Sequence, residues 1–386
     1  MNPLLQRLMQ RSARLDRSGQ LRAATELIQK SLRDAAQWQS PAPDSASASA
    51  AAFAAAAAFT ASAREATVID VDARVLDETR CRAAPDRTSE ADMSEPGARP
   101  ERWSQSQFTH QGRTVAFRLY EPPQIADAPA VAKALVLMLH GCTQDAADFA
   151  AGTQMNALAR AHGVMVLYPE QTAHANSQKC WNWFKPQHQQ RGRGEPALLA
   201  ALTQSVMAQH GVDASRVYVA GLSAGGAMAD IMGRCYPDLF AAVCVHSGLP
   251  RGAAKDVVSA LAAMRSGSTR TAGDGTASPP VIVFHGDADS TVNPANAAAL
   301  VDAVLQDSAP HVGPVDISQG ASAQGRRYTR NLHQTVDGKT TVEHWHLHGA
   351  GHAWAGGSAQ GSFTDPRGVD ASAEMLRFFL ENSRQE

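Results

Sequence analysis

The sequence predicts an α/β fold in which helices cover both faces of a mostly parallel central sheet. Between residues 101 and 386, short apolar runs alternate with longer segments of helical periodicity. Runs that are apolar throughout are typical of parallel strands, because both sides of each strand are buried. A Gly-x-Ser-x-Gly string at residues 221–225 joins one such run to one such helix. We therefore expect residues 101–386 to form one α/β catalytic domain.

Two further segments precede this domain in the 386-residue chain. Residues 1–38 place leucines at mostly helical spacing among arginines, which predicts short amphipathic helices. Such helices pack on the catalytic domain or on a second copy of the chain, or they attach to an apolar surface. Residues 39–100 are rich in alanine, serine and proline and predict a disordered linker.

Composition narrows the classes of function. The 35 lysines and arginines nearly balance the 37 acidic residues, so we expect no basic surface for nucleic acid or for an anionic membrane. Arginines interrupt the apolar residues at the N-terminus, which predicts no cleavable export signal. Residues 46–63 are too weakly hydrophobic to predict a transmembrane segment. The five cysteines form no C-x-x-C pair, which argues against a zinc or redox site of that type.

The elements of the catalytic domain follow from its periodicity. Strands are expected at residues 115–120, 134–139, 164–168, 216–220, 240–246, 281–285 and 342–347. Helices are expected at residues 148–162, 195–210, 225–235, 294–305 and 370–382. Residues 265–278 are rich in glycine, serine and threonine and predict a surface loop.

The Gly-x-Ser-x-Gly string predicts the nucleophile. It follows a strand with β-branched and aromatic residues and precedes an alanine-rich helical segment. A side chain at Gly221 or Gly225 would collide with the neighbouring backbone of so sharp a turn. A strand, this turn and a helix in succession are the nucleophile elbow of an α/β-hydrolase, which exposes the Ser223 hydroxyl at the carboxyl end of the strand.

A serine hydroxyl becomes a good nucleophile when a histidine accepts its proton and an acid orients that histidine. In α/β-hydrolases the order along the chain is serine, acid, histidine, with the last two in loops after late strands. Asp287 and Asp289 both follow the strand of residues 281–285, and spacing does not separate them. His352 lies among glycines after the last strand and is the expected base.

Three other histidines lie on the last strand. His344, His346 and His348 alternate and therefore share one face, where three imidazoles can bind a metal. No acidic or cysteine ligand accompanies them on that face. We expect them to line a polar or solvent-facing edge, and we expect no metal or organic cofactor.

Backbone N–H groups must stabilise the negative charge of the tetrahedral intermediate. One donor is expected from Ala224, and the other from Cys142 in the loop after an early strand. Cys142 is not expected to be a nucleophile, because no base or elbow accompanies it. His140 either orients this loop or is a polar residue of a tight turn.

Aromatic residues suggest where the acyl group binds. Trp181 and Trp183 are adjacent to Phe184, and such a cluster forms either core or the walls of an acyl pocket. Trp354 follows His352 by two residues and is the aromatic residue that we expect to contact substrate.

Several strings together resemble one family. They are Leu-His-Gly-Cys-Thr-Gln at residues 139–144, Cys-Trp-Asn-Trp at 180–183, Gly-Leu-Ser-Ala-Gly-Gly-Ala-Met at 221–228, His-Gly-Asp-Ala-Asp at 285–289 and Gly-His-Ala-Trp at 351–354. In this order they are similar to the catalytic domains of polyhydroxybutyrate depolymerases and the related feruloyl and acetylxylan esterases, over about residues 102–379. The resemblance implies a triad of Ser223, Asp289 and His352, with Cys142 and Ala224 as oxyanion donors. It also suggests that Cys142 and Cys180 pair.

The resemblance also suggests substrates and a location. It implies hydrolysis of poly(3-hydroxybutyrate) or its oligomers, with a feruloyl or acetylxylan esterase as the alternative and a non-catalytic granule-associated protein as the second alternative. The beginning of the chain looks more like intracellular depolymerases, which implies a cytoplasmic location and contact with a storage granule through residues 1–37. Secretion is the alternative. In the cytoplasm a disulfide is not expected.

Overall fold

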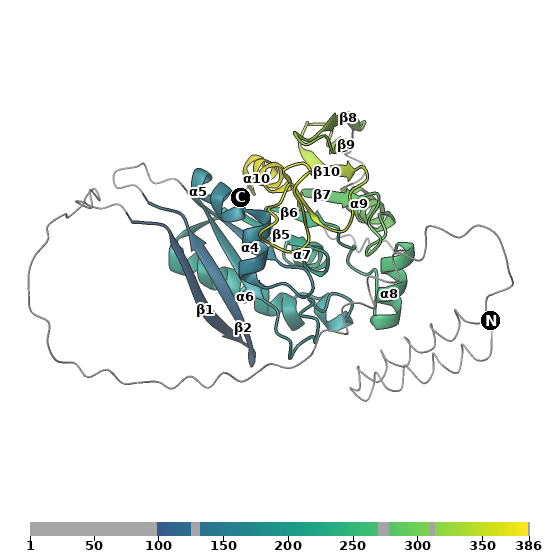
Figure 1. Cartoon of the computed structure of the whole chain (residues 1–386). Helices are drawn as coiled ribbons and strands as arrows, with labels where there is room; N and C mark the ends of the chain where they lie inside the picture. Colours follow the sequence, from purple (N-terminus) through teal and green to yellow (C-terminus); the bar gives the residue numbers. More distant parts are fainter. Residues whose placement is uncertain (1–98, 125–131, 269–277, 309–312, 385–386) are drawn as a thin grey trace, which may run out of the picture. The chain divides into compact units, whose positions relative to one another are not determined.

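The computed structural model describes residues 99–124, 132–268, 278–308 and 313–384 (Figure 1). The helices predicted in residues 1–38 lie outside the described residues, as does the predicted linker up to residue 98. Within the described ranges, no helix is long and apolar enough to cross a membrane.

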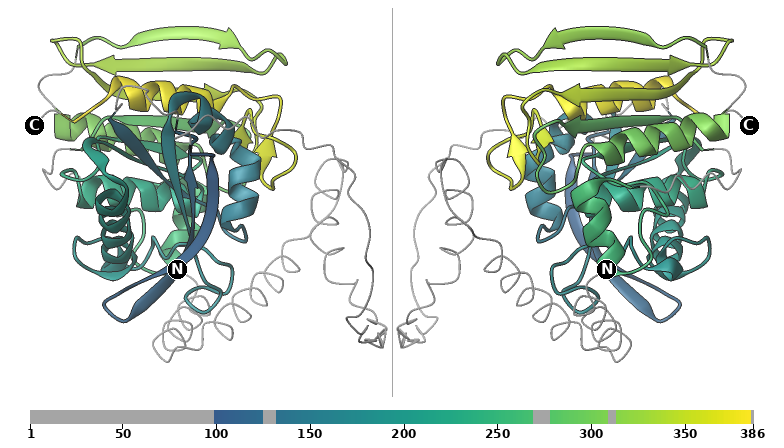
Figure 2. Two further views of the ribbon diagram at one scale, coloured as in Figure 1. Left: turned by 90° about the vertical axis from the view of Figure 1, so that its left-hand side faces the viewer. Right: turned by 90° about the vertical axis from the view of Figure 1, so that its right-hand side faces the viewer.

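One sheet of ten strands organises the domain, in the order β1-β2-β4-β3-β5-β6-β7-β10-β9-β8. Its parallel centre consists of β4 (Val164–Glu170), β3 (Lys133–Leu139), β5 (Val212–Leu222), β6 (Ala242–His246), β7 (Val281–Gly286) and β10 (Thr340–Leu347). Antiparallel strands flank this centre at both edges, with β1 (Arg102–His110) and β2 (Arg113–Glu121) at one and β9 (Arg327–Gln334) and β8 (Asp316–Ala321) at the other. Figure 2 shows the light-green β8 and β9 continuing the sheet at the upper edge.

Helices cover both faces of the sheet, which explains why the central strands are apolar throughout. One hydrophobic core contains side chains of α6 (Gly194–His210), α7 (Ala224–Cys235), α8 (Val257–Ser266) and α9 (Ala295–Ser308). The other contains side chains of α4 (Ala146–Thr153), α5 (Met155–His162) and α10 (Ala371–Glu381). Strand β3 divides its side chains between the two cores, with Leu135 in the first and Val136 in the second.

The expected α/β architecture is confirmed, with differences in detail. The predicted helix at residues 148–162 is two helices, α4 and α5, because Gln154 between them has φ 54°. The sequence did not predict β1, β8, β9 or α8. In β8 most side chains are exposed, so its sequence lacks the apolar pattern that identified the central strands. Helix α8 occupies residues that the sequence assigned in part to the loop of 265–278, of which 269–277 lie outside the described residues.

A disulfide joins the loops that follow β3 and β4. It connects Cys142 and Cys180, which are 38 residues apart in sequence, with Cα atoms separated by 4.2 Å. This pairing confirms what the resemblance suggested, whereas the expected cytoplasmic location did not predict it. Closing a loop of this length restricts the unfolded chain and stabilises the fold by about 3–4 kcal/mol in the chain-entropy picture.

Candidate active site

The elbow lies where β5 ends and α7 begins. Ser223 has φ 58° and ψ −118°, a backbone conformation that non-glycine residues rarely adopt. A Cβ on Gly221 would overlap the backbone of Gly225, and a Cβ on Gly225 would overlap the carbonyl group of Leu139. The Ser223 N–H donates a 2.9 Å hydrogen bond to the carbonyl oxygen of His246 on the next strand, β6. The two glycines and this bond hold the partly exposed Ser223 in its turn.

The predicted base lies next to one of the two candidate acids. His352 Nδ1 is 2.7 Å from Asp289 Oδ2. Because an ionised carboxylate only accepts hydrogen bonds, the proton is on Nδ1 and leaves Nε2 as the basic nitrogen. Asp289 Oδ1 accepts hydrogen bonds of 2.9 Å from the backbone N–H groups of Thr291 and Val292. Burial would raise the pKa of Asp289, but hydrogen bonds from His285, His352 and Val292 outweigh it and hold the pKa below its usual value.

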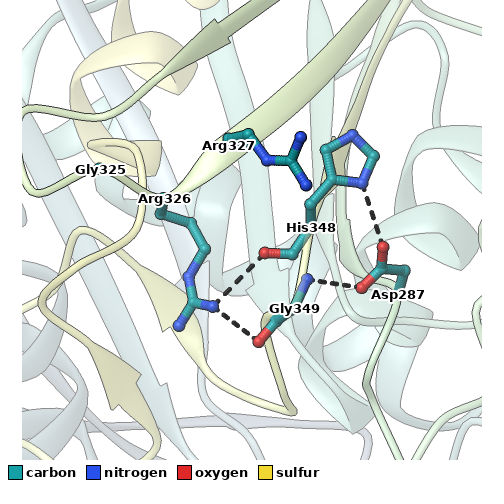
Figure 3. Close-up of a pocket in the computed structure, with 6 residues that line it drawn as sticks. All are labelled: Asp287, Gly325, Arg326, Arg327, His348 and Gly349. Atoms are coloured by element: carbon teal, nitrogen blue, oxygen red, sulfur yellow. Dashed lines mark hydrogen bonds and ion pairs between the residues drawn. The ribbon is translucent and has the colours of Figure 1, made fainter.

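Asp287 has different partners (Figure 3). Its Oδ2 is 3.1 Å from His348 Nδ1, and its Oδ1 accepts a 2.6 Å hydrogen bond from the Gly349 N–H. The structure therefore brings Asp289, and not Asp287, to the predicted base. This distinction agrees with the resemblance and could not be made from spacing.

The register of two strands explains why acid and base meet. β7 and β10 are parallel neighbours, with Gly286 opposite Leu347, so the loops that follow them leave the same edge of the sheet. Ala288 N–H donates a 3.1 Å hydrogen bond to the carbonyl oxygen of Ala350, which ties the two loops together. A Cβ on Gly286 would overlap the Ala350 backbone. Glycine is thus required where the acid loop and the base loop approach most closely.

The loop after β3 lies against the elbow. A Cβ built on Gly141 would be 3.7 Å from the Ser223 Cβ, which brings the residue before Cys142 into contact distance of the nucleophile. The Gly141 N–H is engaged by Gln144 Oε1 at 2.9 Å. Ala224 begins α7, whose N-terminal N–H groups carry partial positive charge. Cys142 follows Gly141, which lies against Ser223, and Ala224 directly follows Ser223, so the two predicted oxyanion donors lie next to the predicted nucleophile in sequence or in space.

His140 orients this loop. Its Nδ1 donates to the carbonyl oxygen of Gly141 at 2.7 Å, and its Nε2 accepts a 3.0 Å hydrogen bond from the Gln171 N–H. Burial lowers the pKa of His140 to about 4, so the ring is neutral near pH 7. Of the two roles left open by the sequence, the structure supports the orienting one.

Sequence reasoning missed His246, which connects the elbow to the base loop. Its carbonyl oxygen accepts the Ser223 N–H, and its Nε2 accepts a 3.0 Å hydrogen bond from the Ala355 N–H. Its ring stacks on Trp354 at 5.0 Å between centroids and on Phe284 at 5.6 Å. Burial lowers its pKa to about 3, which keeps it neutral. The available signal was a histidine at the carboxyl end of an apolar strand next to the elbow.

The tryptophans that were candidates for substrate contact are buried. Trp181, Trp183 and Trp354 are only 1%, 5% and 1% exposed. Trp354 packs edge-on against Phe149 and donates through Nε1 to Ser372 Oγ at 3.0 Å. Rings with so little exposed surface are not accessible to a ligand. This burial corrects the expectation that Trp354 contacts substrate, and it favours the core interpretation of Trp181 and Trp183. Trp181 and Trp183 belong to the core that contains side chains of α6 to α9, and Trp354 belongs to the other core.

Phe363 is an exposed aromatic residue that the sequence did not single out. It is 45% exposed and has φ 53°, which is unusual for a bulky side chain. Its carbonyl oxygen accepts a 2.7 Å hydrogen bond from the Trp354 N–H on the base side. The carbonyl oxygen of the preceding Ser362 accepts a 3.2 Å hydrogen bond from Gln144 Nε2, in the loop after β3. The only sequence signal was an aromatic residue in a glycine- and serine-rich loop.

The three alternating histidines do not share one environment. His344 is buried, which corrects the expectation of a solvent-facing edge for this residue. The rings of His344 and His346 are 3.8 Å apart, whereas His348 is held by Asp287 and by Thr329 Oγ1 at 2.9 Å. Among the described residues, no group of three or more histidine, cysteine or acidic side chains could hold a metal ion.

Known proteins resemble this chain in sequence and fold. The family model described as Esterase PHB depolymerase matches residues 115–309. Poly(3-hydroxyalkanoate) depolymerase C of Paucimonas lemoignei is 33% identical over 63% of this chain and 59% of its own length. Acetylxylan esterase A of Emericella nidulans is 30% identical over 49% of this chain and 66% of its own length. The chain thus spans less than two thirds of either relative.

A solved structure supports the same fold. The acetyl xylan esterase from Aspergillus awamori has a TM-score of 0.55, with 21% identity over 72% of this chain and 98% of the other. Together with the sheet order and the elbow, this match identifies the fold as that of the α/β-hydrolases.

Substitution of the two acids tests the site. Asp289→Asn should lower kcat on p-nitrophenyl butyrate by about three orders of magnitude or more, because an amide does not hold the required tautomer of His352. Asp287→Asn should lower kcat on this neutral ester far less. Circular dichroism and the thermal midpoint would establish that both variants fold. A larger loss in Asp287→Asn than in Asp289→Asn would contradict the assignment.

Proposed function

The chain belongs to the esterase PHB depolymerase family, and on this premise we propose that it is a serine esterase that hydrolyses poly(3-hydroxybutyrate) or 3-hydroxybutyrate oligomers. One observation carries the catalytic part of the proposal. It is the 2.7 Å contact between His352 and the buried Asp289, in a loop next to the strained elbow of Ser223. The polyester substrate is supported by the family and by the depolymerase relative.

The proposed reaction has two steps. Ser223 Oγ attacks the ester carbonyl while His352 Nε2 accepts its proton, and the same proton then passes to the departing alcohol oxygen. Water, deprotonated by His352, attacks the acyl-enzyme, and His352 returns that proton to Ser223 Oγ as the bond between the acyl group and Oγ breaks and the acid is released. Asp289 keeps the Nδ1 proton in place and stabilises the imidazolium. The lowered pKa of Asp289 suits this role, because it keeps the carboxylate ionised. No step requires a cofactor.

The negatively charged oxygen of each tetrahedral intermediate would accept hydrogen bonds from the backbone N–H groups of Cys142 and Ala224. Preorganised donors act without reorganisation, so their rigidity matters. The disulfide to Cys180 holds Cys142, and the hydrogen bond from Thr143 N–H to the Gln178 carbonyl at 2.7 Å holds the same loop. His140 fixes the adjoining Gly141.

A substrate panel tests the proposal against its alternatives. Wild-type protein should hydrolyse amorphous poly(3-hydroxybutyrate) granules and oligomers faster than methyl ferulate or acetylated xylan. Ser223→Ala should lower turnover by several orders of magnitude, whereas Ser318→Ala, which alters an exposed serine of β8, should not. The readout is the release of 3-hydroxybutyrate, ferulate or acetate.

Each other outcome favours a named alternative. Preference for ferulate or acetylxylan would make the protein a carbohydrate esterase like the acetylxylan esterase relative. Binding to granules without any ester hydrolysis would favour a non-catalytic granule-associated protein. Unchanged hydrolysis in Ser223→Ala would reject the nucleophile.

We propose Phe363 as a residue that contacts the substrate, in place of the buried tryptophans. It lies on the segment between the base loop and the oxyanion loop, and its ring is exposed. Phe363→Ala should reduce kcat/KM for p-nitrophenyl octanoate about tenfold, while the acetate ester is affected less, because only the longer chain buries apolar surface on the ring. Val336→Ala, at an exposed apolar residue before the β10 strand, is the control. Equal losses for both esters would contradict a substrate contact.

The disulfide bears on where the protein acts. Such bonds persist in oxidising compartments, so we propose the secreted alternative over a cytoplasmic location. Protein isolated from its native cells with free thiols trapped at lysis should carry no label on Cys142 or Cys180. Labelling of both cysteines would favour the cytoplasmic alternative.

Granule contact through residues 1–37 is part of that cytoplasmic alternative. If it holds, deletion of residues 1–100 should reduce granule binding without reducing turnover of soluble esters.

A further inference from the structure

A cavity lies beside the loops of the acid and the base. It has a volume of about 340 Å³ and is lined by Asp287, Gly325, Arg326, Arg327, His348 and Gly349 (Figure 3). A second cavity of about 210 Å³ also contains Arg327 and His348 in its lining. Arg327 on β9 and His348 after β10 therefore line both cavities, at the side of the sheet where β8 is the edge strand.

Two of the charged groups in the cavity already have partners. Arg326 donates to Asp365 Oδ2 at 2.8 Å and to the carbonyl oxygen of Gly349 at 2.7 Å. Asp287 accepts from the Gly349 N–H and contacts His348 Nδ1. These bonds satisfy the Arg326 and Asp287 charges within the protein.

Arg327 differs from Arg326. Its guanidinium makes no ion pair or hydrogen bond to any residue that the structure describes, and Figure 3 shows it extending toward His348. Its backbone is fixed, because Arg327 begins β9 and its carbonyl oxygen accepts a 2.9 Å hydrogen bond from the His348 N–H. An exposed guanidinium that has no partner among the described residues is suited to a planar anion such as a carboxylate, which it can bind through two parallel hydrogen bonds.

The cavity shares its walls with the catalytic loops. Asp287 precedes the triad acid Asp289 by two residues, and Gly349 precedes His352 by three. A ligand bound there would therefore contact the same two loops that carry the acid and the base.

We infer that this cavity binds the terminal carboxylate of a hydroxyalkanoate oligomer through Arg327. The inference rests on the proposed function. A polyester of hydroxy acids has one carboxylate end, and each hydrolysis creates another, so oligomeric substrates and products are carboxylates. A neutral ester lacks this group. Arg327 therefore confers preference for short, charged chains.

The test compares two forms of one substrate. Arg327→Gln should raise the KM for the 3-hydroxybutyrate trimer acid about fivefold to tenfold, since one charge-assisted contact is lost at a partly solvated site. The KM for the methyl ester of the trimer and kcat for both should stay close to wild type. Arg327→Lys should restore part of the affinity for the acid, and high salt should reduce the wild-type preference.

Arg113→Gln is the matched control, because it removes an exposed arginine from β2 near the opposite edge of the sheet. It should leave both KM values unchanged. Equal KM values for the acid in wild type and Arg327→Gln would overturn the inference, and so would a loss that is the same for the acid and its methyl ester.

A binding measurement separates this inference from the proposed function. Calorimetric titration with 3-hydroxybutyrate should give weaker binding to Arg327→Gln than to wild type. If wild type hydrolyses neither form of the trimer, the proposed function fails, while the titration still decides whether Arg327 binds a carboxylate. Identical titrations for the two proteins would reject the site.

Discussion

Helix α7 can begin directly at the end of β5 only because Gly221 and Gly225 have no side chains. A Cβ on Gly221 would overlap the Gly225 backbone, and a Cβ on Gly225 would overlap the end of β3. This close approach forces Ser223 into a conformation that costs about 1–3 kcal/mol. Burial opposes the strain, since all 12 residues of α7 are buried. The buried helix therefore adds to the two glycines and the hydrogen bond to His246 in holding Ser223 in its strained turn. The other parts of the site are arranged around this fixed point.

The carboxyl edge of the parallel sheet gathers the remaining parts. In the proposed site, the loop after β3 would supply the oxyanion donors, the turn after β5 the nucleophile, the loop after β7 the acid and the loop after β10 the base. Neutral buried imidazoles join these loops, with His140 between the loops after β3 and β4 and His246 between the elbow and the base loop. Burial lowers the pKa of both rings, so each accepts a backbone N–H without placing a charge beside the triad.

The sequence could predict the features that depend on local chemistry. The elbow needs glycines at particular positions, and the chain order of serine, acid and histidine follows from the fold, so both were visible in the residues. Asp289 could not be separated from Asp287 by spacing, because the choice depends on how β7 and β10 pair and how their loops meet. The polar edge strands β8 and β9 also carried no apolar pattern to identify them.

Tertiary packing decided the roles of the aromatic residues. A tryptophan near a catalytic histidine can line a pocket or support a loop, and sequence does not distinguish these cases. Trp354 is buried under the base loop, whereas Phe363, nine residues later, is exposed on the segment that touches both loops. The buried residues support the loops of the proposed triad and have little surface with which to contact a substrate. We therefore propose that selection among esters depends on exposed side chains such as Phe363 and Arg327.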